Sequence, residues 1–234
     1  AECNRGSYLF TTLMNAGSAD DWIEMLELGG FTTAHPYAWW KYYGLYDFNL
    51  DLFPYGLEDL KAAAKKFHDA GYRMDLHHLS QCIQYVDPIF MPEVKADPED
   101  LIERRTYTLA KPFAPGDTVM CVNEKPWDGH TVIMKSHANG NALIIGNEII
   151  QYHDMSFEKP YRFSKISRGK FLTQYYGDIP IKVSEQTFPA GTKVKYMQQR
   201  YGSFYPKPGS KLMEQVSSRV AEVFNACAAD GVYF

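Results

Sequence analysis

Three segments of the chain share one design, in which an amphipathic helical pattern is followed by glycine and then by a short apolar run. They span residues 20–36, 57–79 and 213–234. Repeated helix–glycine–strand units predict parallel strands covered by helices. In such folds, ligands bind at the carboxyl ends of the strands. We therefore expect the functional residues where the apolar runs end.

The last apolar run, Gly231–Phe234, ends the sequence at the point where a functional residue should follow. Earlier strands are predicted at Ser7–Leu13, Phe31–Pro36 and Tyr72–Leu79, which makes the last run strand four. The predicted fold class is α/β, a partial TIM (β/α)8 barrel. The remainder of the barrel, or a companion chain, is then expected as a partner that covers the open side.

The pattern changes from about residue 106, where the helical period is replaced by short β-rich runs. Gly146-Asn147 separates two apolar runs and predicts a two-residue hairpin. The preceding stretch, Asp97–Arg105, is expected to be a helix or connector. These patterns predict an inserted antiparallel β domain at 106–202, between the first half of the barrel at 1–105 and a return to the barrel at 203–234.

Composition excludes several functional classes. The formal net charge is -4 and there is no long basic run, which argues against nucleic acid and against an anionic membrane surface. No apolar run reaches the roughly 18 residues of a membrane span. The four cysteines form no CxxC pair, which argues against a zinc ribbon. Aromatic residues make up 15% of the chain, and their flat apolar faces with polar tips suit amphipathic ligands such as sugars.

Two histidines are the leading site candidates, because each ends a predicted strand. His35 ends the second strand and His77 the third, so both are expected in one cleft. Trp39 and Trp40 lie in the loop that follows His35 and are expected to stack on a sugar. The alternative for His77 is a buried histidine that is hydrogen-bonded to Asp75, two residues earlier on the same strand face.

Other polar residues are weaker candidates. Gln81 follows His77 and Asp47 lies in the loop after the second strand, so both are predicted substrate contacts, although a loop aspartate is more often simply solvated. His77 and His78 point to opposite sides of a strand and are not expected to hold one metal ion. Asp75 is interpreted as the partner of Arg73. We expect no metal and no cofactor.

The run at 52–83 resembles the first part of the α-galactosidase-like clan of (β/α)8 glycoside hydrolases. In that group, a phrase of the form FP-x-G-(L/M)-x-x-L precedes a helix, H-x-x-G ends it, and a strand finishing in G-L-H or a similar sequence follows. The closing DGVYF is similar to the strand that delivers the nucleophilic aspartate, and the chain also resembles bacterial polysaccharide-degrading proteins. The matching residues are Phe53, Pro54, Gly56, Leu57, Leu60, His68, Gly71, Leu76 and His77.

The resemblance implies a glycoside hydrolase that acts on an oligo- or polysaccharide, in a secreted, periplasmic or cell-surface bacterial protein. Such enzymes usually use two carboxylates, and the resemblance places them beyond Phe234, so no catalytic residue is assigned. Of the matching residues, only His77 is carried over as a substrate contact. A carbohydrate-binding protein without catalysis, and a polysaccharide lyase, remain as alternatives.

Overall fold

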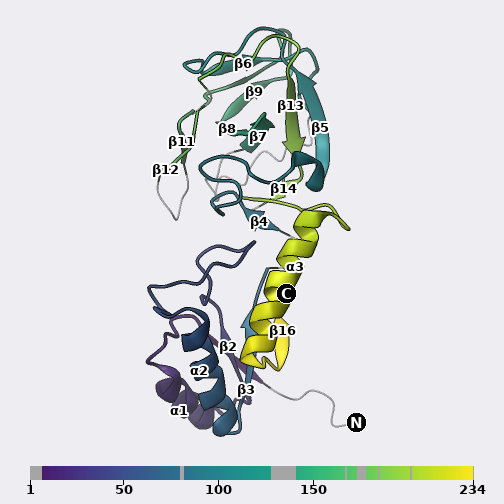
Figure 1. The fold of residues 1–234 in the computed structure, drawn as a ribbon. Helices are drawn as coiled ribbons and strands as arrows, with labels where there is room; N and C mark the ends of the chain where they lie inside the picture. The colour runs from purple at the N-terminus through teal and green to yellow at the C-terminus, as the bar shows by residue number, and fades with distance from the viewer. Residues whose placement is uncertain are drawn as a thin grey trace. The chain divides into compact units, whose positions relative to one another are not determined.

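The computed structural model describes residues 7–79, 82–127, 141–166, 168–172, 178–183, 185–200 and 202–233 (Figure 1). The chain divides into two compact units. Unit 1 combines Ala1–Cys82 with Glu214–Phe234, and unit 2 is Ile83–Met213. These boundaries differ from the predicted ones at 105/106 and 202/203.

Unit 1 is built on a four-stranded parallel sheet in the order β1-β2-β3-β16. The pairs place Phe10 opposite His35, and Gly231 opposite Asp75. The sheet therefore brings the carboxyl ends of strands from distant parts of the sequence to one edge. The strands are β1 (Tyr8–Thr11), β2 (Thr33–Pro36), β3 (Arg73–His77) and β16 (Gly231–Tyr233).

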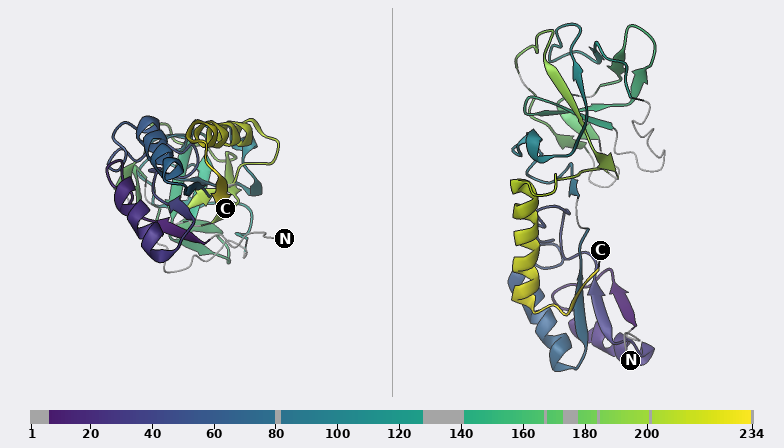
Figure 2. Two further views of the ribbon diagram at one scale, coloured as in Figure 1. Left: turned by 90° about the horizontal axis from the view of Figure 1, so that it is seen from below. Right: turned by 90° about the vertical axis from the view of Figure 1, so that its right-hand side faces the viewer.

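Three helices cover one face of this sheet: α1 (Ala19–Gly29), α2 (Leu57–Asp69) and α3 (Lys211–Cys227) (Figure 2). Side chains of β3 therefore alternate between the face that the helices cover and the opposite face. Met74 and Leu76 are fully buried on the helix side, where the ring of His78, just after the strand, lies 5.7 Å from that of Phe224 in α3. The other face of β3 therefore carries Arg73, Asp75 and His77 away from the helices.

The two ends of α1 differ in how they are capped. Gly30 adopts a left-handed conformation with φ of 66°, as helix-ending glycines commonly do. At the N-terminus, Ser18 makes no capping hydrogen bond to the helix. Its hydroxyl instead accepts from the Asn15 N–H at 2.9 Å and donates to the Asn15 carbonyl oxygen at 3.2 Å.

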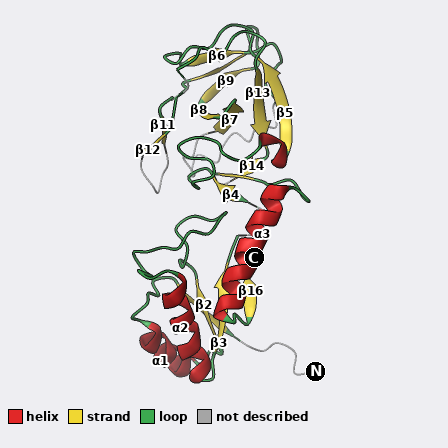
Figure 3. Cartoon of the chain, viewed as in Figure 1, coloured by secondary structure: helices red, strands yellow, loops and turns green. Residues whose placement is uncertain are grey.

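Unit 2 contains the remaining strands, and all its described strand pairs are antiparallel (Figure 3). They form sheets in the orders β5-β13-β7-β8, β6-β10-β9, β14-β15-β4 and β11-β12. The elements are β4 (Ile83–Gln84), the 3-10 turn η1 (Pro98–Asp100), β5 (Glu103–Thr108), β6 (Val119–Cys121), β7 (Asn141–Ile145), β8 (Glu148–Tyr152), β9 (Asp154–Ser156), β10 (Arg162–Ser164), β11 (Lys170–Leu172), β12 (Asp178–Pro180), β13 (Lys193–Met197), β14 (Gln199–Arg200) and β15 (Ser203–Phe204).

Unit 2 has its own hydrophobic core, which includes Tyr107, Leu143, Tyr152 and Phe163. The predicted two-residue hairpin is present, since Ile145 pairs with Glu148 across the turn. At 97–105, where a helix or connector was expected, the structure has a single 3-10 turn followed by β5, whose Tyr107 enters the core.

The predicted partial TIM barrel is wrong. Over the described residues the chain has three helices, and most of its strands form small antiparallel sheets with no eightfold alternation of strand and helix. The physical reason is that the helix–glycine–strand pattern occurs only three times, and it produces an open sheet of four strands. Elsewhere the period of two with frequent turns favours antiparallel pairing. The fold is mainly β.

No helix in the described ranges has the length and apolar character needed to cross a bilayer.

Candidate functional site

The histidines that end β2 and β3 are in contact in unit 1. The Nε2 atom of His35 lies 3.4 Å from the Nδ1 atom of His77, within reach of a long hydrogen bond. Their rings are nearly perpendicular, with centroids 5.5 Å apart. Parallel pairing of β2 with β3 positions them, because both side chains lie on the face opposite the helices. The predicted pairing of these two residues is therefore present.

Both imidazoles are neutral at neutral pH. His35 is 1% exposed and His77 4% exposed. Burial, and secondarily the charge of His77, lower the pKa of His35 to about 4. Burial and the neighbouring His78 likewise lower the pKa of His77 to about 4. A neutral imidazole has one N–H donor and one acceptor nitrogen, so the two buried rings can share a hydrogen bond with each other without burying a charge.

Trp39 and Trp40 are joined to His77 through its backbone. Both indole N–H groups donate to the His77 carbonyl oxygen, at 2.9 Å for Trp39 and 3.1 Å for Trp40. Trp39 is fully buried and stacks on Tyr46, whose hydroxyl donates to the Leu79 carbonyl at 2.7 Å. The two tryptophans therefore fix the loop after β2 to the end of β3. Their burial, 0% and 7% exposed, is not compatible with the predicted stacking of a sugar on Trp39 and leaves little of Trp40 for it.

The aromatic rings that solvent reaches at this site are those of Tyr37, Phe10 and Tyr8. Tyr37 is 38% exposed, and its ring centroid lies 4.6 Å from that of His77. Phe10 makes an edge contact with His35 at 4.7 Å, and Tyr8 an edge contact with Phe10. We call Tyr8, Phe10 and Tyr37 the aromatic rim. The period of two in the first strand places Tyr8 and Phe10 on one face and was the signal in the sequence for them.

Asp75 lies on the same sheet face as His77, one pleat earlier. Burial, followed by the charge of Asp230, raises its pKa, while Arg73 opposes the shift. Asp230 is itself held at the start of β16, where its carboxylate accepts from the Met74 N–H and contacts His68 Nε2, each at 2.9 Å. A Cβ atom at position 231 would lie well under 3.0 Å from the Asp75 carboxylate, so glycine lets β16 approach Asp75 without displacing that side chain. The site thus holds one carboxyl group that takes up protons more readily than usual.

The structure shows no contact between the histidine pair and the two other predicted substrate contacts, Asp47 and Gln81, within the residues it describes. Asp47 is exposed, and its carbonyl oxygen accepts from the Lys41 N–H at 2.8 Å, which shapes the loop. Gln81 lies outside the described residues.

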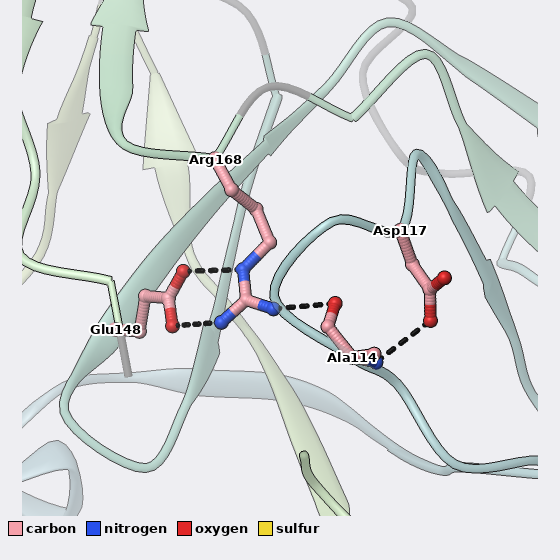
Figure 4. A network of polar contacts seen from close by, with 4 residues as sticks. All are labelled: Ala114, Asp117, Glu148 and Arg168. Carbon is pink, nitrogen blue, oxygen red and sulfur yellow. Dashed lines mark hydrogen bonds and ion pairs between the residues drawn. The ribbon is translucent and has the colours of Figure 1, made fainter. Parts of the chain in front are cut away.

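Unit 2 holds a buried ion pair between Arg168 and Glu148 (Figure 4). Nε and Nη2 of Arg168 donate to the two carboxylate oxygens at 2.8 and 2.6 Å, and Nη1 donates to the Ala114 carbonyl at 2.7 Å. The guanidinium also lies over the Phe113 ring, 4.9 Å from its centroid. Because these donors are engaged within the protein, we assign the pair a structural role.

Within the described ranges, no group of three or more histidine, cysteine or acidic side chains is arranged to hold a metal ion. No protein-family model matches the chain, and no curated protein matches it in sequence.

Proposed function

We propose that this protein is a glycoside hydrolase that binds an oligo- or polysaccharide at the carboxyl edge of the parallel sheet in unit 1. The observation that carries the proposal is the exposed ring of Tyr37, whose centroid lies 4.6 Å from that of the buried His77. A sugar presents an apolar C–H face, which an exposed aromatic ring complements.

The chemistry proposed for the site begins with Asp75. A carboxyl group whose pKa is raised by burial is suited to donate a proton to a glycosidic oxygen. Cleavage usually needs a second carboxylate, and the proposal assigns none. Binding and turnover are therefore tested separately.

Binding is tested by titrating the protein with neutral and acidic oligosaccharides and following tryptophan emission, because the Trp40 ring lies 5.8 Å from that of Tyr37. Tyr37→Ala should weaken binding roughly two- to tenfold through the lost stacking. Tyr55→Ala is the matched control, since Tyr55 is 80% exposed in the same unit. Equal affinity of both variants and the parent protein would remove the aromatic rim from the binding site.

Turnover separates the three functional classes. A hydrolase releases new reducing ends with uptake of water. A lyase acting on uronate polymers takes up no water and leaves, beside each new reducing end, an unsaturated sugar that absorbs short-wavelength ultraviolet light. A carbohydrate-binding protein gives saturable binding without either product. Binding without new reducing ends, on a panel of polysaccharides of different linkage, would reject the hydrolase.

A further inference from the structure

Unit 2 contains an open cleft of about 490 Å³, a size typical of small-molecule sites. Its lining includes three aromatic residues and two glutamines, and its charged residues are Arg104 and Arg200; the others are Trp127, Tyr196, Gln198, Gln199 and Tyr205. Among the described residues that line this cleft there is no acidic side chain. The lining thus combines aromatic rings, amide groups and two positive charges.

The aromatic and amide groups of the cleft are held in place by the fold. The Trp127 backbone N–H donates to the Tyr107 hydroxyl at 3.1 Å, and its ring meets Tyr196 edge-on at 6.2 Å. Gln199 bonds both backbone groups of Ala142: its Oε1 accepts from the N–H at 3.0 Å, and its Nε2 donates to the carbonyl at 2.9 Å. A preorganised lining of this kind loses little conformational entropy when a ligand binds.

The charge of the cleft distinguishes it from the second hollow of unit 2, which measures about 310 Å³. There, Glu148 is bound by Arg168, and Lys182 pairs with Glu93 at 2.8 Å, so acidic and basic groups offset each other. In the cleft, the Nη2 atom of Arg104 donates to the neutral amide oxygen of Gln198 at 2.7 Å. Its full positive charge is therefore kept, and it favours an anionic ligand.

We propose that the cleft binds a saccharide unit that carries a carboxylate. The carboxylate is bound by Arg104, beside which Arg200 also lines the cleft, and the apolar face of the sugar packs on Trp127 or Tyr205. Aromatic and arginine side chains also bind single-stranded nucleic acid, but the net charge of -4 opposes a long polyanion, which makes a short acidic saccharide the better fit. The choice of a saccharide rests on the proposed function, whereas the preference for an anion rests on the cleft alone.

The test uses the full chain and four probes: a short uronic acid oligomer, the neutral oligomer of the corresponding sugar, a sulfated oligomer, and a single-stranded oligonucleotide. Calorimetric titration should show that the uronate oligomer binds most tightly and that its affinity falls as salt is added. The double variant Arg104→Gln/Arg200→Gln should weaken this binding at least about tenfold, because charge-assisted hydrogen bonds are lost. Preference for the sulfated oligomer, the neutral oligomer or a single-stranded oligonucleotide would overturn the carboxylate assignment.

A matched control removes two exposed positive charges elsewhere in unit 2, as Arg162→Gln/Lys111→Gln. Binding within about twofold of the parent protein supports a local site, and an equal loss in both double variants overturns it. Tyr37→Ala separates this proposal from the proposed function. If affinity for the uronate oligomer falls only in the cleft double variant, the result supports the cleft and not the aromatic rim as the binding site. If affinity falls only in Tyr37→Ala, the cleft is rejected while the proposed function stands.

Discussion

The buried pair between Arg168 and Glu148 gives a sharp prediction about the stability of unit 2. The Arg168 side chain is 4% exposed and the Glu148 side chain 2% exposed, and three hydrogen bonds hold the guanidinium. Arg168→Met removes these bonds and leaves a carboxylate buried without its cationic partner. Breaking a buried pair in this way typically costs about 3–5 kcal/mol.

The assay is thermal unfolding followed by calorimetry and circular dichroism. For a chain of this size, the predicted loss lowers Tm by about 6–20 °C. The double variant Arg168→Met/Glu148→Leu removes both charges and should recover much of this loss, because two apolar side chains replace a pair that is costly to desolvate. Asp154→Asn is the control, since the ion pair of Asp154 with Lys165 is exposed and contributes at most about 1 kcal/mol.

Two results would refute this reasoning. The first is a loss for Arg168→Met no larger than that for Asp154→Asn, which would mean that water or another group compensates the buried carboxylate. The second is a loss of stability in the double variant that equals the sum of the losses for Arg168→Met and Glu148→Leu measured singly, because additivity indicates that the two side chains do not interact.

Two further predictions concern unit 1. The pKa of His35 and of His77 is lowered to about 4 in the folded protein, below the ordinary 6.5. The stabilisation from the neutral histidines should therefore be full above about pH 6.5 and fall as the pH decreases toward 4, by up to about 1.4 kcal/mol per pH unit for each histidine. Tm measured against pH should fall less steeply for His35→Gln than for the parent protein. An unchanged slope would contradict the lowered pKa of His35. Gly231→Ala should lower the free energy of unfolding by about 1–3 kcal/mol through the clash with the Asp75 carboxylate, and adding Asp75→Ser should restore the lost stability. Chemical denaturation of the single and double variants measures both effects. If Asp75→Ser does not restore stability, the clash with Asp75 is not the cause of the loss.

The helices and parallel strands of unit 1 were predictable because their signals are local. The apolar stripe and the final glycine predict α2 and β3 to within a few residues. The same local patterns do not specify how many such units close a sheet, which is why the barrel prediction failed. The short period-two runs of unit 2 predicted antiparallel strands, but not which strands pair, because pairing depends on distant residues.

The site was predicted in part. Strand ends were sufficient to bring His35 and His77 together, since parallel pairing places them at one edge. Burial of Trp39 was not predictable, because it depends on a hydrogen bond to the carbonyl oxygen of a residue that lies 38 positions later. A residue whose partners are distant in sequence carries no local signal of its contacts. The same holds for Arg104 and Arg200, which the fold brings to one cleft from positions far apart in the sequence.

The pairing of β3 with β16 has a consequence for the order in which the chain folds. The hydrogen bond from Met74 to Asp230 spans 156 residues, whereas the contact between Thr32 and Ser7, the residues directly before β2 and β1, spans 25. Closing the longer loop costs about 1.6 kcal/mol more in chain entropy if the intervening residues are flexible. Unit 2 lies within that loop and has its own core. Its prior folding would remove most of this entropy cost, so during synthesis the last strand of unit 1 should dock after the intervening unit is complete.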